Sequence, residues 1–322
     1  MRFGPPHSHA PHNARRGWPV IEQDTMSTLQ RERSIILPAR DYDLTATVTS
    51  GQAFRWQLRE GWWEGVIGSR WVRLRAESGS IIGETATPVR DWQWLRDYLQ
   101  VEQDLAQVIA TFPDDKPMRA ALAACGGLRL LRQDPWECLA SFILSSSKQI
   151  VQIRQIVSRL CEQFGEQVIV PQNHEPVYTF PGVARVAAAG EAELRACKMG
   201  FRAPNLRVAA QMIVRDEVEL NRLSGLPVNQ ARGALMQLPG VGRKIADCVL
   251  LFACGFQDAF PVDVWVMRAL RRLYFPGRDV AMKQLQEFAA THFGPHAGYA
   301  QQYLFHYARV HAKLKERESS VL

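Results

Sequence analysis

The chain of 322 residues is long enough to bury a substantial core and to hold two domains. Hydrophobic residues make up 47% of it and charged residues 22%, and no apolar run approaches the roughly 20 residues that span a bilayer, so no transmembrane helix is predicted. The formal net charge of +7 favours a polyanionic partner, although many proteins this basic bind none.

The first 33 residues are predicted to form a disordered arm. They carry several prolines and histidines but no apolar h-region, so they do not make a secretory signal. An alternative is an upstream extension, with the native start at Met26. We therefore expect an intracellular protein that is not secreted, in the cytoplasm with a bacterial nucleoid or in a eukaryotic nucleus.

The six cysteines lack the spacing of a metal site. None forms a C-x-x-C pair, no histidine lies at zinc-finger distance, and no four-cysteine run suggests an iron–sulfur cluster. We expect buried free thiols in a reducing compartment and no metal.

Residues 34 to about 84 are predicted to form strands. Segment 44–48 is β-prone, a Ser50-Gly51 turn follows, and segment 53–56 comes next. Segments 62–67 and 71–75, joined by Gly-Ser, are typical of a hairpin. Several tryptophans lie here, and packing in the core of a sheet is their expected use, with stacking on bases as the alternative.

After Pro88 the apolar residues recur at three- and four-residue spacing, which predicts helices. The expected helices cover residues 90–100, 116–125, 136–144, 150–164, 205–220, 229–237, 243–254, 264–273, 282–292 and 299–314. The predicted fold class is α+β, with an antiparallel β-sheet domain with flanking helices over 34–115 and an all-helical domain over 116–322.

The segment Leu-Pro-Gly-Val-Gly at 238–242 separates two of these helices, within a helix–hairpin–helix at about 229–254. Gly240 and Gly242 permit close approach of a phosphate, and the unpaired N–H groups at the next helix start attract an anion. We expect Gly240, Val241, Gly242 and Arg243 to grip a DNA backbone without reading its sequence. The alternative is an ordinary turn between two helices.

Lys244 follows the hairpin directly, at the expected start of a helix. The positive end of the helix dipole and partial burial both disfavour an ammonium group, which raises the fraction of free amine. A neutral lysine can attack a sugar carbon and form a Schiff base. The alternative is a lysine that only binds phosphate.

Asp263 precedes another predicted helix and is suited to cap it. The alternative to a functional role is that cap alone. A carboxylate there would also stabilise the positive charge that develops as a glycosidic bond breaks. The hairpin, Lys244 and Asp263 together point to removal of a base from DNA.

At these residues the chain resembles the helix–hairpin–helix DNA glycosylase superfamily, and within it the 8-oxoguanine DNA glycosylases. The resemblance is colinear over about 36–310. It is carried by the blocks at residues 50–56, 130–139, 142–146, 200–203, 239–248, 261–264, 296–301 and 304–305.

The resemblance implies roles for single residues. Lys244 is similar to the Schiff-base lysine of the family and Asp263 to its catalytic aspartate. Gly51 stands where a glycine carbonyl accepts the N7–H that distinguishes 8-oxoguanine from guanine. Gln301 corresponds to the reader of the purine's Watson–Crick edge, while Phe305 and Cys248 correspond to the walls that sandwich the flipped base.

The chain departs from the family at the positions that fill the hole left by the base and read the opposite cytosine. Ser147, Lys148 and Gln149 replace three asparagines, and the family's next arginine falls at Gln152, although Arg202 matches the other reader. These departures place a strict preference for cytosine in doubt.

Two pocket positions also differ from the family. Trp265 replaces a histidine and is expected to pack on the lesion strand or to alter the pocket. Phe252 stands where a methionine is frequent, which changes the shape of the pocket rather than its chemistry.

The expected protein is a monomeric, bifunctional glycosylase and AP lyase that acts on double-stranded DNA containing a damaged base. It needs no cofactor for the chemistry, with a structural monovalent cation at the hairpin as an additional possibility. Two alternatives stay open, an alkylpurine glycosylase on the same fold and a lesion-binding protein without catalysis.

Overall fold

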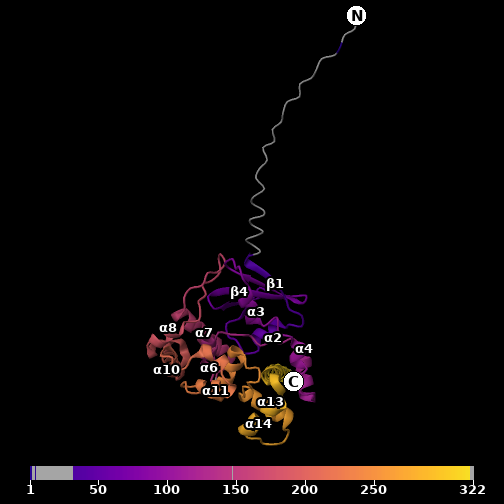
Figure 1. Cartoon of the computed structure of the whole chain (residues 1–322), viewed down its shortest axis with the longest axis vertical. Helices are drawn as coiled ribbons and strands as arrows, with labels where there is room; N and C mark the ends of the chain where they lie inside the picture. Colours follow the sequence, from indigo (N-terminus) through magenta and orange to yellow (C-terminus); the bar gives the residue numbers. More distant parts are fainter. Residues whose placement is uncertain (2–3, 5–31, 147, 320–322) are drawn as a thin grey trace.

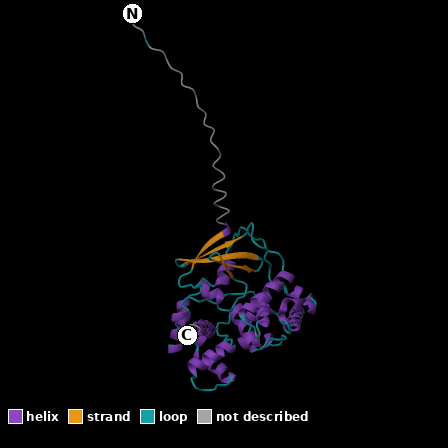
Figure 2. Cartoon of the chain, turned by 180° about the vertical axis from the view of Figure 1, so that it is seen from behind, coloured by secondary structure: helices purple, strands orange, loops and turns teal. Residues whose placement is uncertain are grey.

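The computed structural model describes residues 1, 4, 32–146 and 148–319, and it describes side chains as far as residue 310. The strands lie together at one end of the molecule and helices make up the rest (Figures 1 and 2). The arm predicted over residues 1–33 falls almost entirely outside the described residues.

The N-terminal region contains a five-stranded antiparallel sheet, as predicted. Its order is β1-β5-β4-β3-β2, and neighbouring strands pair antiparallel. The predicted hairpin is confirmed as β3 and β4, with Trp63 opposite Leu74. The strands are β1 (Ser34–Pro38), β2 (Gln57–Arg59), β3 (Trp62–Ile67), β4 (Arg70–Glu77) and β5 (Ser80–Thr85).

The strand predicted over 44–48 was wrong, because this segment is the helix α2 (Leu44–Thr49). The Asp43 side chain accepts a hydrogen bond from the Ala46 N–H at 2.8 Å, which satisfies an amide at the helix start. This cap and the burial of Leu44 and Val48 outweigh the β-propensity of the sequence. Segment 53–56 is not a strand either.

The helical region follows the sheet. Its α-helices are α3 (Gln93–Leu99), α4 (Leu105–Ile109), α5 (Lys116–Ala124), α6 (Pro135–Leu144), α7 (Ile150–Phe164), α8 (Val183–Ala188), α9 (Glu191–Leu194), α10 (Arg202–Val214), α11 (Val228–Leu235), α12 (Arg243–Val249), α13 (Val264–Tyr274), α14 (Met282–His292) and α15 (Ala297–Ser319). Short helical turns add η1 (Arg195–Met199), η2 (Leu220–Gly225), η3 (Leu250–Cys254) and η4 (Gly294–His296). The α+β class is thereby confirmed.

Most predicted helices agree with the structure to within a few residues. The bounds of α7 and α14 are as predicted, and α12 with η3 together cover the expected 243–254. The helix predicted over 205–220 instead begins at Arg202 and ends at Val214. Asp216, just beyond it, has a φ of 56°, so the backbone turns left-handed there and cannot continue the helix.

Two hydrophobic clusters meet at the loop after α2. One lies on the sheet and includes Trp56 and Leu131, and the other fills the helical region and includes Phe54. The buried Gln52 amide donates to the Arg129 carbonyl at 2.7 Å and accepts from the Leu131 N–H at 2.8 Å. The loop that carries Gly51 is therefore held against the chain that leads into α6.

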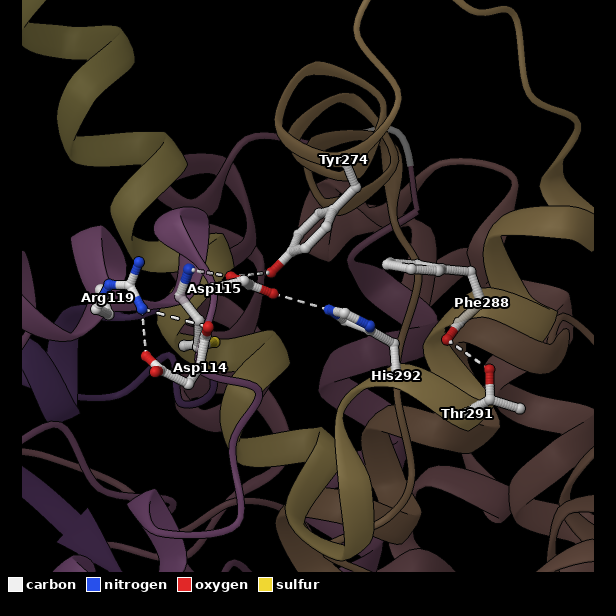
Figure 3. Close-up of polar contacts among 8 residues, drawn as sticks. Asp114, Asp115, Arg119, Tyr274, Phe288, Thr291 and His292 are labelled. Carbon is white, nitrogen blue, oxygen red and sulfur yellow. Dashed lines mark hydrogen bonds and ion pairs between the residues drawn. The ribbon is translucent and has the colours of Figure 1, made fainter.

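A polar cluster joins α5 to the α13–α14 pair at the end of the molecule away from the sheet (Figures 1 and 3). The Tyr274 hydroxyl donates to Asp115 Oδ1 at 3.2 Å, and His292 Nε2 lies 2.8 Å from Asp115 Oδ2. Asp115 Oδ1 also accepts from the Met118 N–H at 2.8 Å, which caps α5. Burial and the nearby negative charge of Asp115 raise the pKa of Tyr274.

All six cysteines are free thiols, as expected. In the part of the chain that the structure describes, no helix combines the length and apolar character needed to cross a membrane.

Candidate active site

A cleft of about 550 Å³ brings together residues from the loop after α2 and from helices α6, α7, α12, α13 and α15. Ten of the residues predicted to serve catalysis or binding line it: Gly51, Lys148, Gln149, Lys244, Cys248, Phe252, Asp263, Trp265, Gln301 and Phe305. Ser147 lies outside the described residues. Sequence blocks that are far apart along the chain therefore converge in this cleft.

Lys244 is the second residue of α12, and its half-buried side chain reaches into the cleft. Its Nζ lies 3.4 Å from Ser145 Oγ and 5.0 Å from the centre of the Phe142 ring. Both partners come from the end of α6 and the residue after it. Since no carboxylate of the described residues forms an ion pair with it, the amine is left available at a helix N-terminus.

Asp263 caps α13, as the sequence predicts. Its Oδ1 accepts a hydrogen bond from the Val266 N–H at 2.8 Å, and the same side chain lines the cleft. The cap fixes the carboxylate on the wall shared with Lys244. Capping and a role in the cleft are therefore compatible in one conformation of this aspartate.

Gly51 and Phe305 lie side by side in the cleft. Gly51 has a φ of 83°, and a Cβ added to it would stand 3.0 Å from Ile150 Cδ1 and 3.3 Å from Phe305 Cε1. Only glycine combines this backbone conformation with such a close approach at little cost. The position explains why the turn after α2 needs a glycine.

Cys248 is buried in the first turns beyond Lys244. Burial raises the pKa of its thiol to about 12, although the Lys244 charge acts in the opposite direction. The side chain is therefore a neutral, compact wall of the cleft. Phe252, one turn further, stacks on Phe142 with ring centres 5.7 Å apart.

Gln301 is 4% exposed, and its Oε1 has no hydrogen-bond partner among the described residues. A buried amide oxygen without a hydrogen-bond partner destabilises the protein by about 1–3 kcal/mol. A ligand that donates a hydrogen bond to this oxygen relieves that penalty when it binds. The next residue, Gln302, donates to the Ser50 carbonyl at 3.0 Å and ties α15 to the turn that carries Gly51. The pocket residues thus belong to one connected wall.

Trp265 and Arg268 lie on α13 near the cleft. The Trp265 side chain lines the cleft and is 43% exposed, and the Arg268 guanidinium lies 5.9 Å from its ring centre. The exposed face of the ring is available to a ligand.

The helix–hairpin–helix is formed by α11, residues 238–242 and α12. Gly240 has a φ of 78°, and a Cβ there would stand 2.8 Å from Asn205 Nδ2. Gly242 is the N-cap residue of α12 and supplies no side chain to its first N–H groups, so these can meet an anion. Gly240, Val241, Gly242 and Arg243 do not line the cleft but precede Lys244 directly.

A buried ion pair joins the two helices of the hairpin. Arg232 Nε on α11 lies 2.6 Å from Asp247 Oδ1 on α12, and Arg243 Nε lies 3.7 Å from Oδ2. Burial raises the pKa of Asp247, while both arginines oppose that shift. The pair holds the hairpin in one geometry.

Arg202 does not line the cleft. Its side chain is 3% exposed, its Nη1 donates to the Met199 carbonyl at 3.4 Å, and its guanidinium lies 4.2 Å from the ring centre of Phe201. Burial lowers the pKa of Arg202. Phe201 itself is 64% exposed. A contact of Arg202 with DNA stays a prediction and requires this side chain to leave its present site.

Sequence reasoning missed several residues of the cleft, among them Phe142, Ser145, Arg154 and Arg309. For Arg309 a signal was present, since it follows Gln301 and Phe305 at four-residue steps on one helix face. Ser145 and Phe142 lie in a block that carried the resemblance but received no role.

Comparisons with known proteins show which family the chain resembles. Residues 34–139 match the model of the 8-oxoguanine DNA glycosylase N-terminal domain, and residues 140–292 match that of the HhH-GPD superfamily of base excision DNA repair proteins. A probable N-glycosylase/DNA lyase of Methanothermobacter thermautotrophicus is 33% identical over 85% of this chain and 95% of its own length. The N-glycosylase/DNA lyase OGG1 of Arabidopsis thaliana is 30% identical over 81% of this chain and 76% of its own.

A solved structure of similar fold is the 8-oxoguanine glycosylase/lyase of Clostridium acetobutylicum, in complex with double-stranded DNA that contains cytosine opposite 8-oxoguanine. It superposes with a TM-score of 0.82, at 29% identity, over 87% of this chain and 97% of that chain. From the shared sequence and fold, this chain belongs to the 8-oxoguanine DNA glycosylase family of helix–hairpin–helix base excision repair proteins.

Proposed function

We propose that this protein is a bifunctional DNA glycosylase and AP lyase that excises 8-oxoguanine from duplex DNA. The observation that carries the proposal is that Lys244 and Asp263 line one cleft together with Gly51, Gln301 and Phe305. A nucleophilic amine, a carboxylate and a base-sized pocket are the parts that such a reaction requires.

In the glycosylase step, the free amine of Lys244 attacks C1′ of the damaged nucleotide. The bond between C1′ and N9 breaks, its electron pair leaves with the base, and the base takes up a proton. The carboxylate of Asp263 stabilises the positive charge on the sugar during this step. The first N–H groups of α12 hold the backbone so that the nucleotide stays in the cleft.

In the lyase step, opening of the sugar ring turns the amine adduct into a Schiff base. Loss of a proton from C2′ then drives electrons toward C3′, and the 3′ phosphate departs by β-elimination. Water finally releases Lys244 from the remaining fragment. These steps use the amine, a proton acceptor and water, so we propose no metal or organic cofactor for them, and a monovalent cation at the hairpin carbonyls stays a prediction.

Recognition of the base is supported by the unpartnered Oε1 of Gln301 and by the bare backbone at Gly51. A purine enclosed by Cys248 and Phe305 would present its edges to these two groups. Guanine lacks the N7–H, so it would leave the backbone acceptor unpaired, which disfavours its binding by about 1–3 kcal/mol.

The test is borohydride trapping on a duplex that contains 8-oxoguanine opposite cytosine. Borohydride reduces the Schiff base, so the wild-type protein is expected to form a covalent complex with DNA that Lys244→Gln cannot form. Lys283→Gln is the matched control, because it removes one lysine charge from a side chain that is 88% exposed on α14 and does not line the cleft.

Each result of the trapping experiment has a definite meaning. Loss of the adduct in Lys244→Gln alone supports the proposal. Base release from methylated but not oxidised DNA would move the assignment to an alkylpurine glycosylase, and tight lesion binding without base release would indicate a binding protein.

We also expect weak discrimination among the bases opposite the lesion. Lys148 and Gln149 line the cleft where the family commonly has asparagine, and the Gln152 Oε1 accepts from the Gln149 N–H at 3.1 Å at the start of α7. Since a specific base contact contributes about 1–3 kcal/mol, its loss should bring excision opposite the four bases within about tenfold. Single-turnover rates on four duplexes measure this, and a preference for cytosine of about a hundredfold would contradict it.

A further inference from the structure

Two arginines line the cleft that have no part in the proposed reaction. Arg154 lies on α7 and Arg309 on α15, so they reach the cleft from different helices. The Arg309 Nη1 donates to the Thr49 carbonyl at 3.3 Å, and its guanidinium lies 5.3 Å from the Phe305 ring centre. The Nε of Arg154 is buried without a hydrogen-bond partner in the described part of the chain.

Both arginine side chains are half-buried. Burial lowers the pKa of Arg309, the positive charge of Arg154 lowers it further, and Asp263 acts in the opposite direction. Burial alone lowers the pKa of Arg154. Within the described residues, neither arginine forms an ion pair with a carboxylate.

The charges of the cleft lining do not balance. The basic side chains are Lys148, Arg154, Lys244 and Arg309, whereas Asp263 is the only acidic side chain among the described lining residues. Partly buried charges without a counterion are costly, and they bind strongly to an anion that enters the site. The chemical class that offers such a charge, with oxygen acceptors for guanidinium donors, is the phosphodiester.

We propose that Arg154 and Arg309 form a two-arginine clamp on one phosphate of the lesion-bearing strand, next to the nucleotide in the cleft. This inference rests on the proposed function, because it takes damaged DNA as the ligand. The clamp and the hairpin stand on different elements, so they would hold the backbone at two separate places.

A phosphate fits these arginines better than a base edge does. Base acceptors are neutral and cannot offset two positive charges, whereas each phosphate carries a full negative charge. Arg154 also lines a neighbouring cavity of about 320 Å³ beneath the sheet, which places it at the border between the two cavities.

The experiment measures affinity against salt concentration for a duplex with a tetrahydrofuran abasic analogue, which has no base and cannot react. Each phosphate contact contributes roughly 0.9 to the slope of log affinity against log salt. The double variant Arg154→Gln/Arg309→Gln is expected to lower the slope by about 0.9, the contribution of the one phosphate that both arginines contact, and each single variant by a smaller amount. Arg154→Lys should retain the slope while losing part of the affinity, because it keeps the charge but not the planar fork.

The matched control is Arg222→Gln, which removes one arginine whose side chain is 77% exposed and lies on η2 outside the cleft. It should leave the slope as in the wild type. The Arg154 side chain makes no hydrogen bond to the described residues, so replacing it removes no internal contact of that kind. Arg154→Gln therefore keeps the test decisive if Arg309→Gln, which loses the hydrogen bond to Thr49, is unstable.

A second arm distinguishes phosphate from base. An equal loss of affinity for the abasic and the 8-oxoguanine duplexes supports the clamp. Replacing the clamped phosphate by one neutral methylphosphonate should also abolish the difference in affinity between the wild type and the double variant. A loss of affinity confined to the duplex that carries 8-oxoguanine would overturn the clamp and indicate that the arginines contact the base. An unchanged slope of log affinity against log salt would also overturn the clamp. Because the abasic duplex does not react, failure of the clamp and failure of the proposed excision are seen in separate experiments.

Discussion

At the residue scale, Asp263 caps α13 and lines the cleft, and its proposed chemical role is distinct from the cap. The hydrogen bond from the Val266 N–H to Oδ1 stabilises the start of α13, while the carboxylate charge faces the cleft. Substitutions at this position can separate the two contributions, because an asparagine retains the capping oxygen and an alanine does not.

We expect Asp263→Asn to lower the single-turnover excision rate by about 10²–10³-fold, since it removes the charge that stabilises the transition state. Its free energy of unfolding should stay close to that of the wild type. Asp263→Ala should show a similar loss of rate and, in addition, a loss of about 1 kcal/mol of stability. Denaturant titration and rate measurements on the same preparations check this, and a full-rate Asp263→Asn would leave the aspartate with the cap alone.

At the scale of elements, the hairpin contains two glycines that differ in backbone conformation and in their surroundings. Gly240 needs its positive φ and has Asn205 against it, whereas Gly242 has an ordinary φ of −92° and open space where a Cβ would stand. Gly240 therefore serves the shape of the hairpin, and Gly242 leaves the start of α12 open.

Gly240→Ala is expected to destabilise the fold by about 1–2 kcal/mol, because a Cβ strains the left-handed conformation. Gly242→Ser should preserve or slightly raise stability, since serine is a favourable N-cap, yet weaken DNA binding because its Oγ competes with phosphate for the helix N–H groups. Thermal unfolding and binding to undamaged duplex separate these effects. Unimpaired binding by a well-folded Gly242→Ser would show that α12 does not grip the backbone.

At the scale of the whole molecule, α13 is held at both ends. Its N-terminus carries Asp263 in the cleft, and Tyr274 at its C-terminus contacts Asp115 before α5 (Figure 3). His292 from α14 contacts the same carboxylate, so one side chain joins three helices. The cluster sets the position of the helix that presents the proposed catalytic carboxylate.

Tyr274→Phe should lower the free energy of unfolding by about 1 kcal/mol, because it removes a hydrogen bond to a partly buried carboxylate. For a chain of this size the corresponding fall in Tm is about 2 °C. Tyr178→Phe is the matched control, since its hydroxyl makes no hydrogen bond to the described residues. Equal Tm values for both variants would mean that the contact to Asp115 contributes nothing.

Much of the fold followed from local patterns. The Gly-Ser turn at 68–69 between segments 62–67 and 71–75 predicted the hairpin of β3 and β4, and apolar spacing predicted α7 and α14 with their bounds. Segment 44–48 was assigned wrongly, because a single capping interaction from Asp43 decided between two states of similar propensity. The end of α10 at Val214 was missed for a similar local reason, the left-handed residue Asp216.

The candidate site was also predicted only in part from the sequence. The sequence alone predicted that an anion-binding hairpin, an amine and a carboxylate occur together. The prediction came from Gly-Val-Gly, Lys244 and Asp263 in one short segment and from the blocks shared with the family. The family resemblance implied that Gly51 and Gln301, which are far apart in the chain, face the same base, and the tertiary structure places both in the cleft with Lys244 and Asp263. Only the tertiary structure decided that Arg154 and Arg309 face the cleft while Arg202 is buried elsewhere, because those placements depend on how helices pack and on which charges are left without partners.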